Sequence, residues 1–340
     1  MRALFWTSLL LLAATAAAQR TAINDLGTGM YLGQFEGGLY ENGSNLPPAD
    51  HRSAELQHAA AVRPLDRNGN PSPDGRIVLL SIGMSNTTQE YCATNNPAPC
   101  SAWSFAGQAA SDPSVNHRTL AIVNGARSGQ TSGAWDAPTD PNYDQIRDTN
   151  LGPAGFTERQ VQAAWVKVAN AQPTVSLPSP NADAQHLIRQ LGDIVRALKT
   201  RYPNLQLVFI SSRIYAGYAI TTLNPEPYAY ETGFAVKWVV AAQIEQRRGA
   251  RVDPAAGNLD DRNAAPWIGW GPYLWADGMN ARSDGLTWAR ADLEGDGTHP
   301  SQSGEQKVGA MLLDFLKHDP GATSWFLAET PRPRRRATLP

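Results

Sequence analysis

Three polar side chains from two distant segments of the 340-residue chain could together perform acyl transfer. Asp296 precedes His299 by three residues, so its carboxylate can curl back and accept a hydrogen bond from the imidazole. Such a bond orients the ring and stabilises the imidazolium that forms when the histidine takes a proton. Ser85, in Gly-Met-Ser-Asn, is the candidate nucleophile for this base. The pattern predicts a catalytic triad of Ser85, His299 and Asp296.

Each of these segments also has a plainer interpretation. Ser85 could simply cap a helix or occupy a turn. The His299 segment could be an exposed loop that leads into a helix. Asp292-x-Glu294-x-Asp296-Gly297 opens like a calcium-binding loop, but position twelve would be Ser303 instead of glutamate, which argues against calcium.

A third segment, Asn124-Gly-Ala-Arg-Ser-Gly-Gln-Thr131, is rich in small residues and follows a predicted strand. Small residues allow backbone amides to approach a ligand, as an oxyanion hole requires. Taken alone, the segment could equally be an ordinary glycine-rich turn. It becomes informative only together with the other two segments.

The elements that must position these residues alternate along the chain. Short apolar, β-branched runs indicate buried strands, and apolar residues at helical spacing indicate amphipathic helices. We expect strands at 77–82, 119–123, 161–168 and 205–210, and helices at 101–110, 184–199, 228–246 and 304–317. Buried strands that alternate with helices predict an α/β fold with a parallel sheet covered on both faces. Ligands bind beyond the carboxyl ends of such strands, where the three segments fall.

In order and spacing the three segments resemble the SGNH (GDSL-like) hydrolase superfamily. The matching pieces are Gly-x-Ser-Asn, Asn-x-x-x-Ser-Gly-x-Thr and Asp-x-x-His-Pro, over residues 76–317. The first piece is closest to the Gly-x-Ser-Asn of sialate and acetylxylan esterases. The resemblance implies a three-layer α/β/α, flavodoxin-like fold with a mostly parallel sheet. It also implies a serine esterase that needs neither cofactor nor metal.

The resemblance further implies an oxyanion hole. The backbone amides of Ser85 and Gly129 would bind the oxyanion, and an asparagine after the third strand would donate a third hydrogen bond. The family's Gly-x-Asn-Asp is incomplete here, because Asn170 lies in Val-Ala-Asn-Ala without the glycine or the aspartate. Asn170 is the first candidate for this donor, and Lys167 is the alternative. Met84 replaces the usual aspartate before the nucleophile.

These features predict an exported carboxylic ester hydrolase that removes acetyl or other acyl groups from a carbohydrate or another small ester. Aromatic residues in Gly/Pro-rich connections could line a sugar groove, although each could equally be core: Tyr215, Tyr218, Trp267, Trp270 and Trp275. A lipase or thioesterase of the same superfamily is an alternative. Because the family's Gly-x-Asn-Asp piece is degraded around Asn170, a non-catalytic glycan-binding or structural relative is another.

The chain divides into four parts. Residues 1–18 have a basic start, an apolar run and a small-residue cleavage site after Ala18, as in a secretory signal peptide. The apolar run is short for a membrane anchor, and no later run is longer, so we expect a secreted or periplasmic protein without stable membrane insertion. Residues 19–75 form an extended lead-in, 76–328 the hydrolase domain, and 329–340 a disordered basic tail. The net charge of −2 argues against nucleic-acid binding.

Cys92 and Cys100 are the only cysteines, and they flank a loop rich in Pro and Asn. In an oxidising compartment such a pair is expected to form a disulfide. A metal site would need more ligands than these two, and an exported thiol nucleophile would tend to oxidise.

Overall fold

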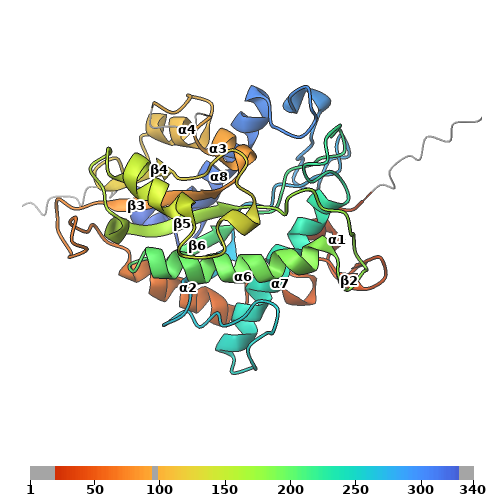
Figure 1. The fold of residues 1–340 in the computed structure, drawn as a ribbon, viewed down its shortest axis with the longest axis horizontal. Helices are drawn as coiled ribbons and strands as arrows, with labels where there is room; N and C mark the ends of the chain where they lie inside the picture. Colours follow the sequence, from red (N-terminus) through yellow and green to blue (C-terminus); the bar gives the residue numbers. More distant parts are fainter. Residues whose placement is uncertain (1–19, 94–98, 329–340) are drawn as a thin grey trace, which may run out of the picture.

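The computed structural model describes residues 20–93 and 99–328, and its centre is a five-stranded, wholly parallel sheet (Figure 1). Its strands are β3 (Ile77–Gly83), β4 (Leu120–Asn124), β5 (Val161–Lys167), β6 (Leu207–Ile210) and β7 (Trp267–Trp270). Their order across the sheet is β4-β3-β5-β6-β7. The chain passes from β3 to one neighbour and then returns to the other side, which is the flavodoxin-like order. The predicted α/β class is confirmed.

Helices cover both faces of this sheet (Figure 1). The helices are α1 (Ile23–Leu26), α2 (Ala49–Ala61), α3 (Ser85–Tyr91), α4 (Phe105–Ser111), α5 (Pro141–Gln145), α6 (Asp183–Arg201), α7 (Tyr228–Arg247), α8 (Gln302–His318) and α9 (Thr323–Phe326). Single turns of tighter or wider helix lie at η1 (Glu41–Gly43), η2 (Ser132–Ala134), η3 (Ile146–Leu151), η4 (Glu158–Gln160) and η5 (Arg290–Asp292). A small hairpin joins β1 (Met30–Tyr31) to β2 (Phe35–Glu36).

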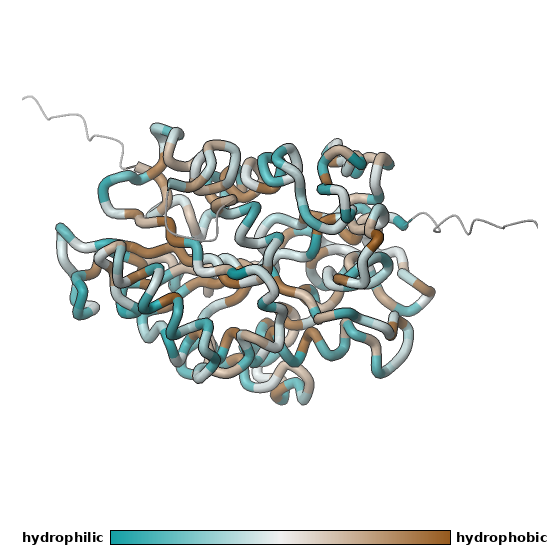
Figure 2. Tube along the Cα trace, turned by 45° about the horizontal axis from the view of Figure 1, so that its top comes forward, coloured by the Kyte–Doolittle hydropathy of each residue, from teal (hydrophilic) through white to brown (hydrophobic). Residues whose placement is uncertain are grey.

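The inner strands β3, β5 and β6 and the strand β7 are mostly apolar because every residue in them is buried, whereas the edge strand β4 is mostly half-buried. Every residue of β3 is buried. Val78, Leu80 and Ile82 belong to a core shared with α6 and α7, whereas Ile77 and Leu79 belong to a second core shared with α2, α4, α8 and α9. Apolar stretches of the chain lie inside and hydrophilic ones gather at the periphery (Figure 2). The three layers thus follow from side-chain alternation on twice-covered strands.

Several elements were not expected from the sequence, among them β7, α3 and α2. The strand β7 is only four residues long and lies between Pro266 and Gly271, which resemble a loop boundary. The helix α3 begins at Ser85 itself and contains mostly polar residues. In the lead-in, α2 buries two alanines together with the polar residues His51 and Glu55, so it lacks the apolar stripe that identifies a helix. The helix expected from residue 101 begins at Phe105, because the Ser104 hydroxyl caps it by accepting a bond from the Gly107 amide.

The tryptophans that could have lined a sugar groove are core residues instead. Trp267, Trp270 and Trp275 are all buried, and Trp267 stacks on His51 with ring centroids 4.8 Å apart. Tyr215 and Tyr218 are half-buried and pack edge to face against each other. The groove interpretation is therefore wrong for the three tryptophans.

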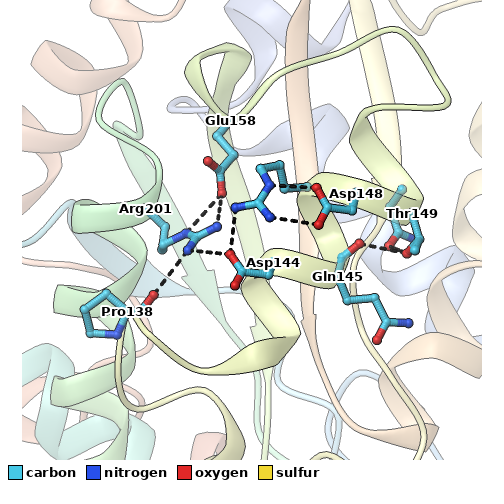
Figure 3. Close-up of polar contacts among 9 residues, drawn as sticks. Pro138, Asp144, Gln145, Asp148, Thr149, Glu158 and Arg201 are labelled. Atoms are coloured by element: carbon cyan, nitrogen blue, oxygen red, sulfur yellow. Dashed lines mark hydrogen bonds and ion pairs between the residues drawn. The ribbon is translucent and has the colours of Figure 1, made fainter.

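Charged contacts fasten the connection between β4 and β5 to the last turn of α6 (Figure 3). The Arg201 guanidinium binds Glu158 at 2.5 Å and Asp144 at 3.0 Å. Arg147 binds the same Asp144 carboxylate at 2.7 Å and also contacts Asp148. The long segment that carries Gly129 is thereby held against the end of α6.

A disulfide joins Cys92 to Cys100, as the sequence predicts. It lies directly after α3, and the Ser101 amide also donates to the Cys92 carbonyl at 3.0 Å. The end of the helix that begins with Ser85 is therefore covalently held.

Two predictions concern segments outside the described residues: the signal peptide at 1–18 and the basic tail at 329–340. Within the described part of the chain, no helix combines the length and apolar character needed to cross a bilayer.

Candidate active site

The carboxyl end of β3 turns sharply into α3 and presents Ser85 as the first residue of that helix. Gly83 permits this turn, because a β-carbon there would lie 2.2 Å from the carbonyl oxygen of Lys167 on the neighbouring strand. The Thr87 hydroxyl donates to the same carbonyl at 2.6 Å. The Ser85 hydroxyl is thus held at the rim of the sheet, at the start of a helix.

The structure brings the three residues of the predicted triad together. The hydroxyl oxygen of Ser85 lies 2.8 Å from Nε2 of His299, and Nδ1 of His299 lies 2.5 Å from a carboxylate oxygen of Asp296. When Nδ1 donates its proton to Asp296, Nε2 is the acceptor that faces the serine hydroxyl. This is the arrangement in which a histidine can remove a proton from serine.

Asp296 is set up to stay ionised beside the imidazole. Partial burial by itself would raise the pKa of this carboxyl, but donors from His299 and Thr298 outweigh burial and lower the pKa below its ordinary value. Its second oxygen accepts backbone amides of Thr298 at 2.9 Å and His299 at 3.0 Å. The carboxylate is therefore fixed in place and negatively charged at neutral pH.

The loop that carries Asp296 and His299 is clamped from two sides. Gly297 adopts φ 66°, and a β-carbon there would lie 1.9 Å from the Tyr218 carbonyl oxygen, so only glycine fits. On the other side, the Asn86 side chain donates to the Thr298 carbonyl at 2.9 Å. Because Asn86 directly follows the nucleophile, this hydrogen bond joins the segment of Ser85 to the loop that carries Asp296 and His299. This role was not foreseen, because the motif names the residue but not its distant partner.

The predicted oxyanion donors meet at the same rim. Gly129 adopts φ 79° in the turn after β4. The carbonyl of Ala169 accepts both the amide and the hydroxyl of Ser132, at 3.0 and 3.1 Å, which joins this turn to the end of β5. Asn170 follows Ala169, and both Asn170 and Gly129 line the cavity that contains Ser85.

Lys167, the alternative third donor, is excluded by its position. Its side chain is fully buried, and its ammonium binds both carboxylate oxygens of Glu90 at 2.5 Å. Burial lowers the pKa of Lys167 to about 8, although Glu90 opposes this, and burial likewise raises the pKa of Glu90 against the pull of Lys167. This pair joins α3 to β5 behind the nucleophile and does not face the cavity.

The cavity over Ser85 and His299 has a volume of about 670 Å³. Met84, Ala171 and Leu223 supply its apolar side chains, and its other lining residues are polar apart from Gly129. The sequence alone did not identify the polar residues that line this cavity from the segments after β6. No spacing or motif distinguishes them from ordinary loop residues.

Among residues 20–93 and 99–328, no three His, Cys, Asp or Glu side chains form a group that could hold a metal ion.

No protein-family model and no curated protein matches this sequence. The solved structures that match include lipases and carbohydrate esterases, at low similarity. An extracellular lipase from Streptomyces rimosus is 17% identical with a TM-score of 0.35, over 72% of this chain and 99% of that one. A protein named as a GDSL-like lipase, from Parabacteroides merdae, is 14% identical with a TM-score of 0.38, over 70% and 94%. A family two carbohydrate esterase from Cellvibrio japonicus is 11% identical with a TM-score of 0.38, over 75% and 64%. Matches this weak carry no conclusion about activity or substrate.

Proposed function

We propose that this protein is a serine ester hydrolase that works through an acyl-enzyme intermediate. The observation that carries the proposal is the 2.8 Å contact between the Ser85 hydroxyl and His299 Nε2, with Asp296 on the other side of the ring. A structural serine would not need a histidine so oriented in an open cavity. The geometry meets the requirement for a nucleophile, a base and a group that orients the base.

In the proposed reaction, Ser85 attacks the ester carbonyl while His299 takes the hydroxyl proton. The imidazolium then gives this proton to the departing alkoxide, which leaves as the alcohol. An ester between the acyl group and Ser85 remains. Water, deprotonated by the same imidazole, then attacks the acyl group. The bond to the Ser85 oxygen breaks, the imidazolium returns the proton to that oxygen, and the carboxylic acid leaves. Asp296 stays ionised and stabilises the imidazolium in both halves.

The negative charge on the tetrahedral intermediate needs donors on the side of the cavity formed after β4 and β5. The backbone amides of Ser85 and Gly129 and the side chain of Asn170 are our candidates. Such preorganised donors act on charge that develops only in the transition state, so they lower the barrier more than they improve substrate binding.

An Asn170→Ala variant is expected to lose roughly 100- to 1000-fold in kcat with little change in KM. The measurement is steady-state hydrolysis of p-nitrophenyl acetate. Ser53→Ala, on the exposed side of α2, is the control for handling and should match the parent protein. An Asn170→Ala variant with full kcat would show that the third donor is a different group.

For the substrate we propose an O-acylated carbohydrate with a short acyl group such as acetyl. Only three of the side chains that line the cavity are wholly apolar, which leaves a long acyl chain few apolar side chains to pack against, whereas a short one needs fewer. Its volume of about 670 Å³ is suited to a short acyl group joined to a sugar residue.

The test is acetate release from a panel of acetylated polysaccharides, with p-nitrophenyl acetate as a general ester. Turnover of the general ester without acetate release would confine the proposal to esterase activity. Turnover of long-chain esters only would point to a lipase. No turnover by well-folded protein would favour a glycan-binding relative that has kept the fold.

We propose that residues 1–18 direct export and are removed. Expression of the full chain in a bacterial host should place the protein in the periplasm or medium, and N-terminal sequencing should begin at Gln19. A cytoplasmic protein that retains Met1 would contradict this.

A further inference from the structure

Arg213 lies just beyond β6 and is one of the residues that line the cavity containing Ser85 and His299. Only 1% of the residue is exposed. Two of its guanidinium nitrogens, Nε and Nη2, are buried and have no hydrogen-bond partner among the described residues. A buried arginine normally has its nitrogens paired, because an uncompensated buried charge is costly.

The neighbouring carboxylates do not supply the missing partner. Glu90 and Asp296 attract the Arg213 charge from a distance, but their own hydrogen bonds go to Lys167 and His299. The third carboxylate, Glu226, accepts bonds from other donors. Burial of the charged group therefore lowers the pKa of Arg213 despite these carboxylates. Within the cavity, Arg213 supplies a positive charge without a bonded counter-ion.

Two further groups in the same cavity are unpartnered. The side-chain oxygens of Asn224 and Gln89 are buried, and neither has a hydrogen-bond partner among the described residues. Asn224 comes from the same β6–α7 segment as Arg213, and Gln89 comes from α3. Buried polar atoms in native proteins are almost always satisfied, so such a cluster in one cavity points to a polar ligand.

We infer that Arg213 binds a carboxylate carried by the substrate, so the hydrolase would prefer acidic esters to neutral ones. The planar guanidinium presents parallel N–H groups that match the two oxygens of a carboxylate. Arg213 reaches the cavity from the segment after β6, whereas the oxyanion candidates come from β3, β4 and β5. Glu294 also lines the cavity but is exposed, so solvent screens its charge. This inference rests on the proposed ester hydrolysis.

The carboxylate could belong to the acyl group or to the alcohol, and matched substrate pairs separate the two. Monoethyl succinate against ethyl butyrate tests the acyl side. A mono-O-acetylated methyl galacturonide against the acetylated methyl galactoside tests the sugar side. We expect kcat/KM to be about 30-fold or more higher for the acid in one pair, the range expected for a desolvated charge pair.

In Arg213→Met the ratio of kcat/KM for the acidic ester to that for the neutral ester should fall to about one. Arg213→Lys should keep part of the preference, because it retains the positive charge but loses the paired N–H groups of the guanidinium. Arg189→Met, which removes an exposed arginine from α6, is the control for net charge and should keep the preference. Since Arg213 has no partner to lose, Tm of Arg213→Met should equal or exceed that of the parent. A lower Tm with an unchanged preference would overturn the inference and assign Arg213 a structural role.

Failure of the inference can be told apart from failure of the proposed function. If the parent protein hydrolyses the neutral esters but shows no acid preference in either pair, the carboxylate subsite is wrong and the esterase remains. If no ester is hydrolysed, ligand binding still tests the subsite. The increase in Tm of Ser85→Ala is measured with methyl galacturonide and compared with methyl galactoside, and likewise with succinate and compared with butanol. Equal shifts within both pairs would then refute it.

Discussion

Ser85→Ala is expected to lower kcat for p-nitrophenyl acetate by about 10⁴- to 10⁶-fold, down to the rate that binding and oxyanion donors alone can support. The reason is geometric: the hydroxyl that His299 contacts at 2.8 Å would be gone, and no other group would take its place on that nitrogen. Tm should change little, because the serine side chain is partly exposed and its hydroxyl bonds only the imidazole.

Substitution of the proposed base, His299, provides a second test of the same unit. His299→Ala should lower kcat to a level similar to that of Ser85→Ala, and the double variant should be no worse than either alone, since the two residues act as one unit. Additive losses would show that the serine and the histidine work independently. Activity above about one per cent in Ser85→Ala would identify another nucleophile.

Lys167→Met is expected to reduce the free energy of unfolding by about 3–5 kcal/mol. Removing the ammonium leaves Glu90 fully buried without the one side chain that bonds its carboxylate among residues 20–93 and 99–328. Glu90→Met should cost a similar amount for the converse reason. Denaturant titration measures both, with midpoints compared at a common m value.

The double variant Glu90→Met/Lys167→Met is the informative control. With both charges gone and similar volume filled, most of the lost stability should return, because an apolar pair avoids the desolvation cost of the ions. Arg147→Met, which breaks an exposed ion pair with Asp144, should have a much smaller effect. If the double variant is as unstable as the sum of the single ones, the contact contributes through shape and not through charge.

The layered fold could be predicted because its signal is local. The apolar runs at β3, β5 and β6 and the stripe on α6 are visible in single windows of sequence. Among the elements that were missed, β7 and α3 depend on tertiary burial. A four-residue Trp-Ile-Gly-Trp strand and a polar Ser-Asn-Thr-Thr helix become regular only because neighbouring elements cover them.

The candidate site divides in the same way. Ser85, Asp296 and His299 stand in short segments whose spacing indicates their chemistry, so they could be selected before the fold was known. Asn86 and Arg213 could not, since their importance depends on a carbonyl and a cavity contributed by other elements. Lys167 shows the limit of placing polar residues by strand order alone: it ends β5, one residue before the predicted end, and its side chain is buried against Glu90.

The hydrogen bond between Asn86 and the Thr298 carbonyl also bears on the order in which the site forms during synthesis. During synthesis the serine emerges 214 residues before the histidine, and before the long α8, which packs on α3. A growing chain therefore lacks the candidate base until that later segment has emerged and folded onto the earlier one.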